Sequence, residues 1–175
     1  DFGGKYFSKL NKSVINKNGY EICEIFGVDD ELDSQFWKKY LYEYVTKEPS
    51  RKFASEVIKT LKDRGNEIYI ITARYLTDKN TEEGQQMRQI VIDWLRKQKI
   101  VYDKLVFAPE DKLQICLENS IDVMIEDKVT NIERISTQIP VICFHASYNK
   151  DCKNGNVYRA YNWYDIYNLI NGGKI

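Results

Sequence analysis

Two adjacent carboxylates, Glu126 and Asp127, follow the apolar run that begins at Ile121. A short apolar run of this kind predicts a buried strand. In an open α/β fold, a parallel strand delivers the residues that follow it to the carboxyl edge of the sheet, where ligands bind. Two acids at that edge suit a hard cation such as Mg²⁺. An alternative stays open, in which both acids only cap the next helix.

Two other predicted strands also end in groups that could do chemistry. Thr72 closes the run EIYIIT, and Lys112 soon follows the run KLVF at residues 104–107. If these strands are parallel, their carboxyl ends share one edge with Glu126 and Asp127. A hydroxyl, an ammonium and two carboxylates can together hold a metal-bound phosphate. As alternatives, the lysine is an ordinary surface residue and the threonine a simple strand-end hydroxyl.

The elements that must position these groups alternate between helix and strand from residue 50 onward. Apolar residues at helical spacing separate short β-rich runs, which is typical of a parallel sheet with helices on both faces. We therefore predict a Rossmann-like α/β fold. Helices are predicted at 34–49, 50–64, 85–99, 113–117, 129–136 and 163–170, and strands at 67–72, 104–107, 121–125, 140–144 and 157–158.

Residues 1–49 do not join this alternation and are predicted to form a small helical N-terminal segment. Its helix has Ser34 as the expected N-cap and carries aromatic residues at helical spacing, among them Phe36, Trp37 and Tyr40. An aromatic face of this kind is most often buried, so we expect these side chains to pack in a core. Stacking on a nucleotide base is the alternative role.

Composition narrows the classes of function. The chain has 175 residues, with 26 Lys and Arg against 26 Asp and Glu, and this balance argues against a general nucleic-acid binder. It has no apolar run of the roughly 20 residues that span a bilayer. We therefore expect a cytoplasmic protein without membrane or nucleic-acid partners. The single histidine, His145, excludes a multi-histidine zinc site, so the chemistry should rest on carboxylates, lysine and hydroxyl groups.

At these residues the chain resembles the haloacid dehalogenase-like (HAD) phosphatase superfamily, and within it the cytosolic 5'(3')-deoxyribonucleotidase-like group. That superfamily shows a strand-terminal Thr or Ser, then a Lys, then an acidic pair, in this order. Here IITAR matches the second motif at Thr72, EDK matches the third at Lys112, and IEDKVTN matches the fourth at Glu126, Asp127 and Asn131. The resemblance covers nearly the whole chain.

The resemblance implies a Mg²⁺-dependent, nucleotidase-like phosphatase that hydrolyses phosphate monoesters through an aspartyl-phosphate. Asp127 would be the metal ligand, with Glu126 second, and Asn131 would orient them from the next helical turn. The substrate would be a small phosphorylated molecule such as a nucleotide. Residues 1–49 would form a cap, and 50–175 the HAD-like core. A homodimer is possible. An alternative function is that of a non-catalytic relative that binds a metal, a phosphate ligand or a partner.

The same resemblance assigns the phosphate contacts. Thr72 and Lys112 would be catalytic and would bind the phosphoryl group together with Ala73 and Arg74. One departure is the segment ICFHASYN, because the group more usually has DAPYN there. We expect His145 in this segment to be a loop residue rather than a catalyst.

The family's first motif, DxDGT or DxDGV after a buried strand, supplies the nucleophilic aspartate and is absent from this sequence. Either Asp1 is the nucleophile, with Gly3 in place of the second aspartate, or Asp1 lies downstream of the motif. We prefer the second interpretation, because no apolar strand precedes Asp1. The family fold places the missing strand between 67–71 and 121–125. A hole there would leave backbone groups unpaired at about 1–3 kcal/mol each, so we expect a longer protein, with this chain inactive alone.

Overall fold

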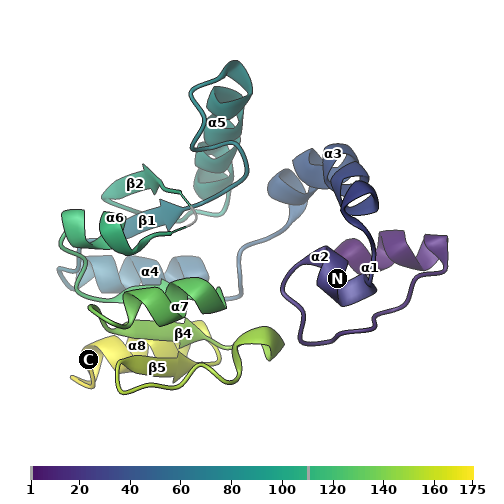
Figure 1. The fold of residues 1–175 in the computed structure, drawn as a ribbon. Helices are drawn as coiled ribbons and strands as arrows, with labels where there is room; N and C mark the ends of the chain where they lie inside the picture. Colours follow the sequence, from purple (N-terminus) through teal and green to yellow (C-terminus); the bar gives the residue numbers. More distant parts are fainter. Residues whose placement is uncertain (1, 110) are drawn as a thin grey trace. The chain divides into compact units, whose positions relative to one another are not determined.

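The computed structural model describes residues 2–109 and 111–175 and divides into two compact units. The first unit holds the described residues up to Glu48 together with Ala146–Asp151. The second holds Pro49–His145 and Cys152–Ile175, and Figure 1 shows the elements of both as a ribbon. The interpretation of Asp1 as a nucleophile falls outside the described residues, and so does Glu110 of the EDK motif.

The first unit is built from short helices around an aromatic core. Phe7, Phe26 and Phe36 are buried together, and the rings of Phe7 and Phe26 stack with their centroids 4.7 Å apart. The Ser147 hydroxyl donates a hydrogen bond to the carbonyl of Lys17 and ties the later segment to this unit. Aromatic burial is therefore the main source of its stability. Its elements are α1 (Phe2–Phe7), η1 (Ser8–Leu10), α2 (Ile22–Phe26), α3 (Asp30–Lys47) and η2 (Ser147–Asn149).

Helix α3 begins earlier than its sequence pattern predicts. The N-cap is Asp29 rather than Ser34, because the Asp29 side chain accepts a hydrogen bond from the Leu32 backbone N–H at 2.9 Å. The acidic residues that follow also suit the positive end of the helix dipole. The prediction of core packing is confirmed for Phe36, which is fully buried. Tyr40 packs against the same cluster and also lines a surface hollow.

The second unit alternates between helix and strand, and the order predicted from residue 50 onward is confirmed. None of the helices in the described residues is both long enough and apolar enough to cross a membrane. The elements are α4 (Ala54–Asp63), β1 (Tyr69–Thr72), α5 (Glu82–Lys97), β2 (Lys104–Phe107), α6 (Leu113–Glu118), β3 (Met124–Glu126), α7 (Val129–Ile135), β4 (Val141–Phe144), β5 (Val157–Ala160) and α8 (Trp163–Asn171).

Several boundaries in this unit differ from the predictions, and three of them have a clear local cause or consequence. Helix α4 begins after Phe53 rather than at residue 50, because Phe53 has a left-handed backbone with a φ of 68°. Gly84 lies inside α5 rather than in the loop before it, because its backbone N–H donates to the capping hydroxyl of Thr81 at 3.1 Å. Strand β3 spans Met124–Glu126 rather than residues 121–125, and Glu126 is its last residue.

The strands form two separate parallel sheets. β1 pairs with β2 from Tyr69 opposite Lys104 to Thr72 opposite Phe107. β4 pairs with β3 on one side and with β5 on the other. Across the described residues, no pairing joins β1 to β3. The structure thus has a break in its sheet at the position where the sequence predicts one.

Helices cover both faces of these sheets. In β4, Ile142 and Phe144 pack in a cluster with α8, whereas Val141 and Cys143 pack in a cluster with α6 and α7. In β1, Ile70 packs in a third cluster with α4 and α5. Adjacent strand residues therefore alternate between two covered faces, as strand geometry requires. The fold is α/β and Rossmann-like, as predicted.

Candidate active site

A buried ion pair joins Lys112 to Glu126. Lys112 stands directly before α6, in the connection that leaves β2, and Glu126 ends β3. The lysine Nζ lies 2.7 Å from Glu126 Oε2, and the two side chains are only 13% and 4% exposed. A charge removed from water is costly without a partner, so each group depends on the other. The pair fixes an ammonium group beside the carboxyl end of β3.

Glu126 uses its whole carboxylate to hold neighbouring groups. Oε1 accepts hydrogen bonds from the backbone N–H groups of Asp127 at 2.9 Å and Lys128 at 3.1 Å. Oε2 accepts from the buried Asn131 amide at 3.3 Å as well as from Lys112. A carboxylate has about four lone-pair sites, so these donors fill it. These bonds fix the connection before α7, whose N-cap Lys128 has no side-chain cap, and they occupy the Glu126 oxygens that the predicted metal role would need.

The electrostatic environment keeps Glu126 charged. Burial on its own raises the pKa of this carboxyl, but the Lys112 ammonium and the backbone donors at Lys128 and Asp127 outweigh burial and lower the pKa below its ordinary value. Cys116 lies close to the same pair, and burial raises the pKa of its thiol. A thiol held in the protonated form is a weak nucleophile. Cys116 is therefore a core residue of this site and not its reactive group.

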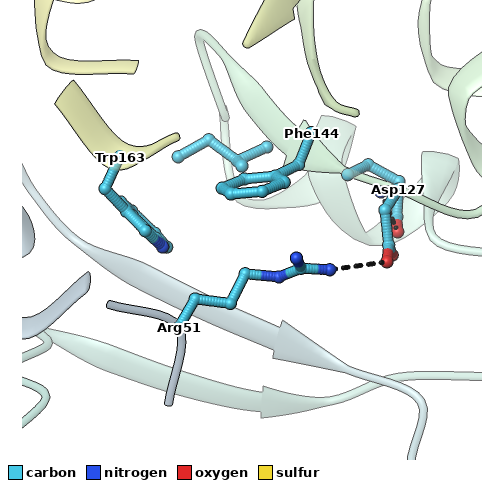
Figure 2. Close-up of a pocket in the computed structure, with 6 residues that line it drawn as sticks. Arg51, Asp127, Phe144 and Trp163 are labelled. Carbon is cyan, nitrogen blue, oxygen red and sulfur yellow. Dashed lines mark hydrogen bonds and ion pairs between the residues drawn. The ribbon is translucent and has the colours of Figure 1, made fainter. Parts of the chain in front are cut away.

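Asp127 faces a pocket next to the ion pair (Figure 2). The Asp127 side chain is 36% exposed, and its Oδ2 lies 3.7 Å from Nη2 of Arg51. This distance allows an ion pair but is too long for a hydrogen bond. Of the two acids, Asp127 is thus the one that solvent can reach. The pocket measures about 170 Å³ and is lined by Arg51, Ile125, Glu126, Asp127, Phe144 and Trp163.

Thr72 ends β1, in the other sheet of the same unit. Its neighbour Ile71 packs in one buried cluster with Met124 of β3, so the two strand ends share a core. The Thr72 side chain is half-buried. Within the described residues, no hydrogen bond or ion pair links Thr72 to Lys112 or Asp127. The structure brings the lysine and the two acids together and leaves Thr72 at the end of a neighbouring strand.

Ala73 and Arg74 open the loop that follows β1. Arg74 is exposed, and its carbonyl accepts hydrogen bonds from the Thr77 backbone N–H at 3.0 Å and hydroxyl at 2.6 Å. The Thr77 carbonyl accepts in turn from Arg88 of α5 at 2.8 Å. Helix α5 therefore holds this loop in a defined turn at the carboxyl end of β1.

His145 contacts residues of the β5 segment. Its Nδ1 lies 3.2 Å from an Nη of Arg159, and its ring centroid lies 4.8 Å from that of Tyr161. The Arg159 guanidinium also donates to the carbonyl of Cys152 at 2.8 Å. Because a guanidinium can only donate, the His145 Nδ1 accepts in this contact. These contacts hold the His145 ring against Arg159 and Tyr161.

Comparison with known proteins supplies the family. The sequence model of the family described as 5' nucleotidase, deoxy (Pyrimidine), cytosolic type C (NT5C) matches residues 28–175, which is most of the chain. The chain belongs to this family. Membership of the NT5C family confirms the predicted resemblance to the HAD-like deoxyribonucleotidase group.

Bacterial proteins with nucleotidase names are similar to this NT5C family member over most of its length. It is 28% identical over 167 residues to a nucleotidase of Clostridium acetobutylicum, and the match covers 93% of this chain and 82% of that protein. It is 30% identical over 172 residues to a protein of Oceanobacillus iheyensis that carries a nucleotidase name, with 92% of this chain and 86% of that protein covered.

The family resemblance implies a bound Mg²⁺, and one carboxylate of this NT5C family member fits as a ligand. Within the described residues, no group of three or more His, Cys, Asp and Glu side chains could hold a metal ion. Mg²⁺ is usually bound by one or two carboxylates, with waters and substrate phosphates as the remaining ligands. Asp127 fits as one such carboxylate because its side chain faces the pocket. The described residues do not complete the site.

Sequence reasoning missed Arg51, Phe144 and Trp163 as pocket residues. They come from the segment before α4, the end of β4 and the start of α8, which lie far apart in the sequence. Phe144 ends a predicted strand, so the strand pattern could have placed it at the same edge as Asp127. No local signal separates Arg51 from nearby surface cations. Trp163 has the pattern of an ordinary core residue of an amphipathic helix.

Proposed function

We propose that this protein hydrolyses the phosphate monoester of a small substrate, a nucleotide, with Mg²⁺ as its cofactor. The observation that carries the proposal is the buried Lys112–Glu126 pair, which fixes a cation next to the accessible carboxylate of Asp127. Membership of a nucleotidase family supports the substrate class. The cytoplasmic location expected from the sequence belongs to the same proposal.

The proposal gives separate roles to the residues that bind phosphate. Lys112 neutralises the oxygens of the phosphoryl group, because Glu126 orients its ammonium and holds it in place. Thr72 donates a hydrogen bond to the same group from the end of β1. Ala73 and Arg74 contribute the loop that borders the substrate.

The two adjacent acids, Asp127 and Glu126, have different roles in the proposal. Asp127 would hold Mg²⁺, and the bound ion would offset phosphoryl charge. Glu126 and Asn131 are positioning residues, because their hydrogen bonds fix Lys112 and the backbone of Asp127. Glu126, which the sequence predicted as a second metal ligand, is thus proposed to position Lys112 instead.

The nucleophile of the proposal is an aspartate carried by sequence outside residues 1–175. The break between β1 and β3 supports this, because one parallel strand there would complete the sheet and bring its carboxyl end between Thr72 and Asp127. The carboxylate would attack phosphorus, the ester P–O bond would break, and water would then hydrolyse the aspartyl-phosphate. Residues 1–175 alone would then be inactive.

Residues 1–49 are proposed as a helical cap that selects the substrate, and residues 50–175 as the HAD-like core. Binding specificity in such folds is set by added segments rather than by the shared core. Phe36 is fully buried, and it lines a surface hollow of this segment together with Tyr6 and Tyr40. Stacking of these aromatic residues on a base stays an alternative to core packing.

The test uses the full-length protein, including any sequence that precedes Asp1. Phosphate release is measured from nucleoside 5'-monophosphates and sugar phosphates, with and without Mg²⁺. Lys112→Ala should lower kcat about 100-fold or more, as loss of a fixed transition-state donor does. Lys59→Ala is the matched control, because Lys59 pairs with Asp63 on an exposed helix face and should leave kcat unchanged. Failure to hydrolyse any of these substrates contradicts the proposal.

A non-catalytic relative that binds a metal, a phosphate ligand or a partner is the second candidate. The break between β1 and β3 favours it as long as no strand with an aspartate fills the gap. The sequence that precedes Asp1 in the full-length protein separates the two candidates. A buried strand followed by a DxDGT-like motif favours the phosphatase, and a start codon directly before the codon of Asp1 favours the binding protein.

A further inference from the structure

The position of the Lys112 ammonium depends on two supports, and the active-site description covers only one of them. Glu126 holds Nζ, at the far end of the side chain. A lysine has a flexible four-carbon stem, so a contact at Nζ does not fix the backbone that carries it. Lys112 is the N-cap residue of α6, a helix of only six residues. A helix this short is not rigid by itself. The backbone at Lys112 therefore needs a support of its own.

Asp111 supplies this support with both of its carboxylate oxygens. Oδ1 accepts a hydrogen bond from the backbone N–H of Leu113 at 3.1 Å, which closes a turn around Lys112. Oδ2 lies 2.8 Å from Nε of Arg134 in α7. This distance is typical of a charge-assisted hydrogen bond. Asp111 thus closes the turn that contains Lys112 and ties that turn to α7.

Helix α7 is a firm base for these contacts, because both of its isoleucine side chains are fully buried in the core. It packs beside α6 (Figure 1). Asn131 of α7 donates to Glu126 Oε2 at 3.3 Å, and Arg134 lies three residues further along, on the same side of the helix. One helix therefore holds Glu126, which binds the Lys112 ammonium, and Asp111, which fixes the Lys112 backbone.

The Arg134–Asp111 pair differs from the Lys112–Glu126 pair in its exposure to solvent. The side chains of Arg134 and Asp111 are 64% and 49% exposed. An exposed pair contributes little to the free energy of unfolding, and salt screens it more than a buried pair. A displacement of about 1 Å at a catalytic group can nevertheless lower a rate about 100-fold. The pair is therefore suited to set a position rather than to stabilise the fold.

We propose that Arg134 is a positioning residue for Lys112 and acts through Asp111. Arg134 itself contacts no substrate. It holds the turn before α6, so that the Lys112 ammonium meets the phosphoryl group in one orientation. This inference rests on the proposed function and deepens it, because Arg134 lies outside the motifs that assign the other site residues. It also makes turnover sensitive to ionic strength.

The first test compares kcat and KM of full-length variants. Arg134→Met should lower kcat about 5-fold and leave KM within about twofold, because the ammonium is kept but misplaced. Arg134→Lys keeps a charge and should restore at least about half of the lost kcat. Asp111→Asn keeps an acceptor for Leu113 and loses the charge, so it should match Arg134→Met. The double variant Asp111→Asn/Arg134→Met should be no worse than either single variant, because both residues act through one contact.

Arg96→Met is the matched control. Arg96 pairs with Asp93 on α5 at 2.9 Å, with side chains 74% and 55% exposed. Each methionine variant should change Tm by less than about 4 °C, but only Arg134→Met should lower kcat. In about 0.5 M salt the ratio of kcat between the unaltered protein and Arg134→Met should fall toward one, because salt screens the exposed pair. A loss that salt leaves unchanged would show that the ion pair is not its cause.

A second readout follows Lys112 itself and does not need activity. Nitrogen-15 NMR relaxation of its side-chain ammonium in the full-length protein measures how firmly the group is held. The order of this group should fall in Arg134→Met and stay unchanged in Arg96→Met.

Three outcomes overturn the positioning role: equal kcat in the two methionine variants, a loss in the double variant as large as the product of the single losses, or unchanged order of the ammonium in Arg134→Met. If that order falls as expected but the unaltered full-length protein hydrolyses no substrate, the proposed function fails and the support of Lys112 by Arg134 stands. If the unaltered protein hydrolyses a nucleotide and Arg134→Met keeps its kcat, the positioning role alone fails.

Discussion

Replacing Lys112 by methionine leaves the Glu126 carboxylate, only 4% exposed, without a cation beside it. We expect Lys112→Met to lower the free energy of unfolding by about 3 kcal/mol, because breaking a buried pair strands a charge. The double variant Lys112→Met/Glu126→Gln should recover most of this loss, since a neutral amide oxygen can still accept from the backbone at Asp127 and Lys128. Denaturant unfolding followed by circular dichroism measures both values.

The matched control for this pair is Lys59→Met. Lys59 and Asp63 form an exposed pair one helical turn apart, with side chains 63% and 60% exposed. Removing the lysine there should change the free energy of unfolding by less than about 1 kcal/mol. The interpretation of Lys112 as a buried, coupled charge is wrong if the double variant is no more stable than Lys112→Met.

Substitution of His145 tests whether the only histidine takes part in hydrolysis. Its ring contacts Arg159 and Tyr161. We expect His145→Ala to leave kcat/KM of the full-length protein within about threefold of its original value, a change of less than about 0.7 kcal/mol in transition-state binding. Steady-state hydrolysis of the best nucleotide substrate provides the measurement. A loss as large as that of Lys112→Ala would make His145 a catalytic residue.

At the residue scale, sequence patterns identified the groups that one strand end and the next helix bring together. Lys112, Glu126 and Asn131 are joined by hydrogen bonds, and Asn131 reaches Glu126 at the end of β3 from the first turn of α7. The sequence could not predict that Glu126 pairs with Lys112 while Asp127 faces the pocket. This difference depends on which carboxylate meets the buried lysine, and on Arg51, which approaches from a distant part of the chain.

At the scale of elements, helix α5 and the loop before it depend on Gly84. Alanine in a helix is ordinarily about 1 kcal/mol better than glycine. At this position, however, an added Cβ would run into the carbonyl oxygen of Lys79 and lie 2.8 Å from that of Leu76. We expect Gly84→Ala to lower the free energy of unfolding by about 1–3 kcal/mol, the usual cost of overpacking. Thermal and denaturant unfolding of the purified variant give this value.

Gly155→Ala is the control for this prediction, because an added Cβ there meets nothing within 4 Å. It should change stability by less than about 0.5 kcal/mol. Peptide-level hydrogen exchange adds a local readout, since Arg88 of α5 holds the carbonyls of Thr77 and Lys79. Gly84→Ala should speed exchange in that loop. Equal stability of the two variants would contradict a close contact between the loop and α5.

The order and type of the helices and strands could be predicted from the sequence, but the residues at which they begin and end could not. The sequence pattern located β2 at Lys104–Phe107 without error, because its apolar run is short, follows Asp103 and ends shortly before Pro109. The start of α4 was misplaced because no sequence pattern predicts a left-handed backbone at Phe53. The start of α3 was misplaced because Asp29 and Ser34 are both good N-cap residues, and the aromatic pattern used to place the helix begins only after Ser34.

At the scale of the whole molecule, the alternation of helix and strand determined the fold class, and a missing motif indicated where the sheet is broken. β4 has a partner on both sides, whereas β1 and β3 each have a partner on one side within the described residues. In a parallel sheet, a strand with one partner leaves half of its backbone groups without a bond in the sheet. The sequence could not predict how Arg51 fills the pocket beside β3, because that arrangement depends on tertiary packing.

Hydrogen exchange of residues 1–175 and of the full-length protein tests whether a strand fills that break. Amides of β1 and β3 should exchange faster than those of β4 in residues 1–175, because only β4 is paired on both sides. In the full-length protein, β1 and β3 should gain protection, since a strand between them would bind the remaining groups. β5 is the control, because it lies at the other edge of its sheet and should be unchanged. Protection that stays the same in β1 and β3, or that rises equally in β5, would exclude an added strand between the sheets and with it the proposed source of the nucleophile.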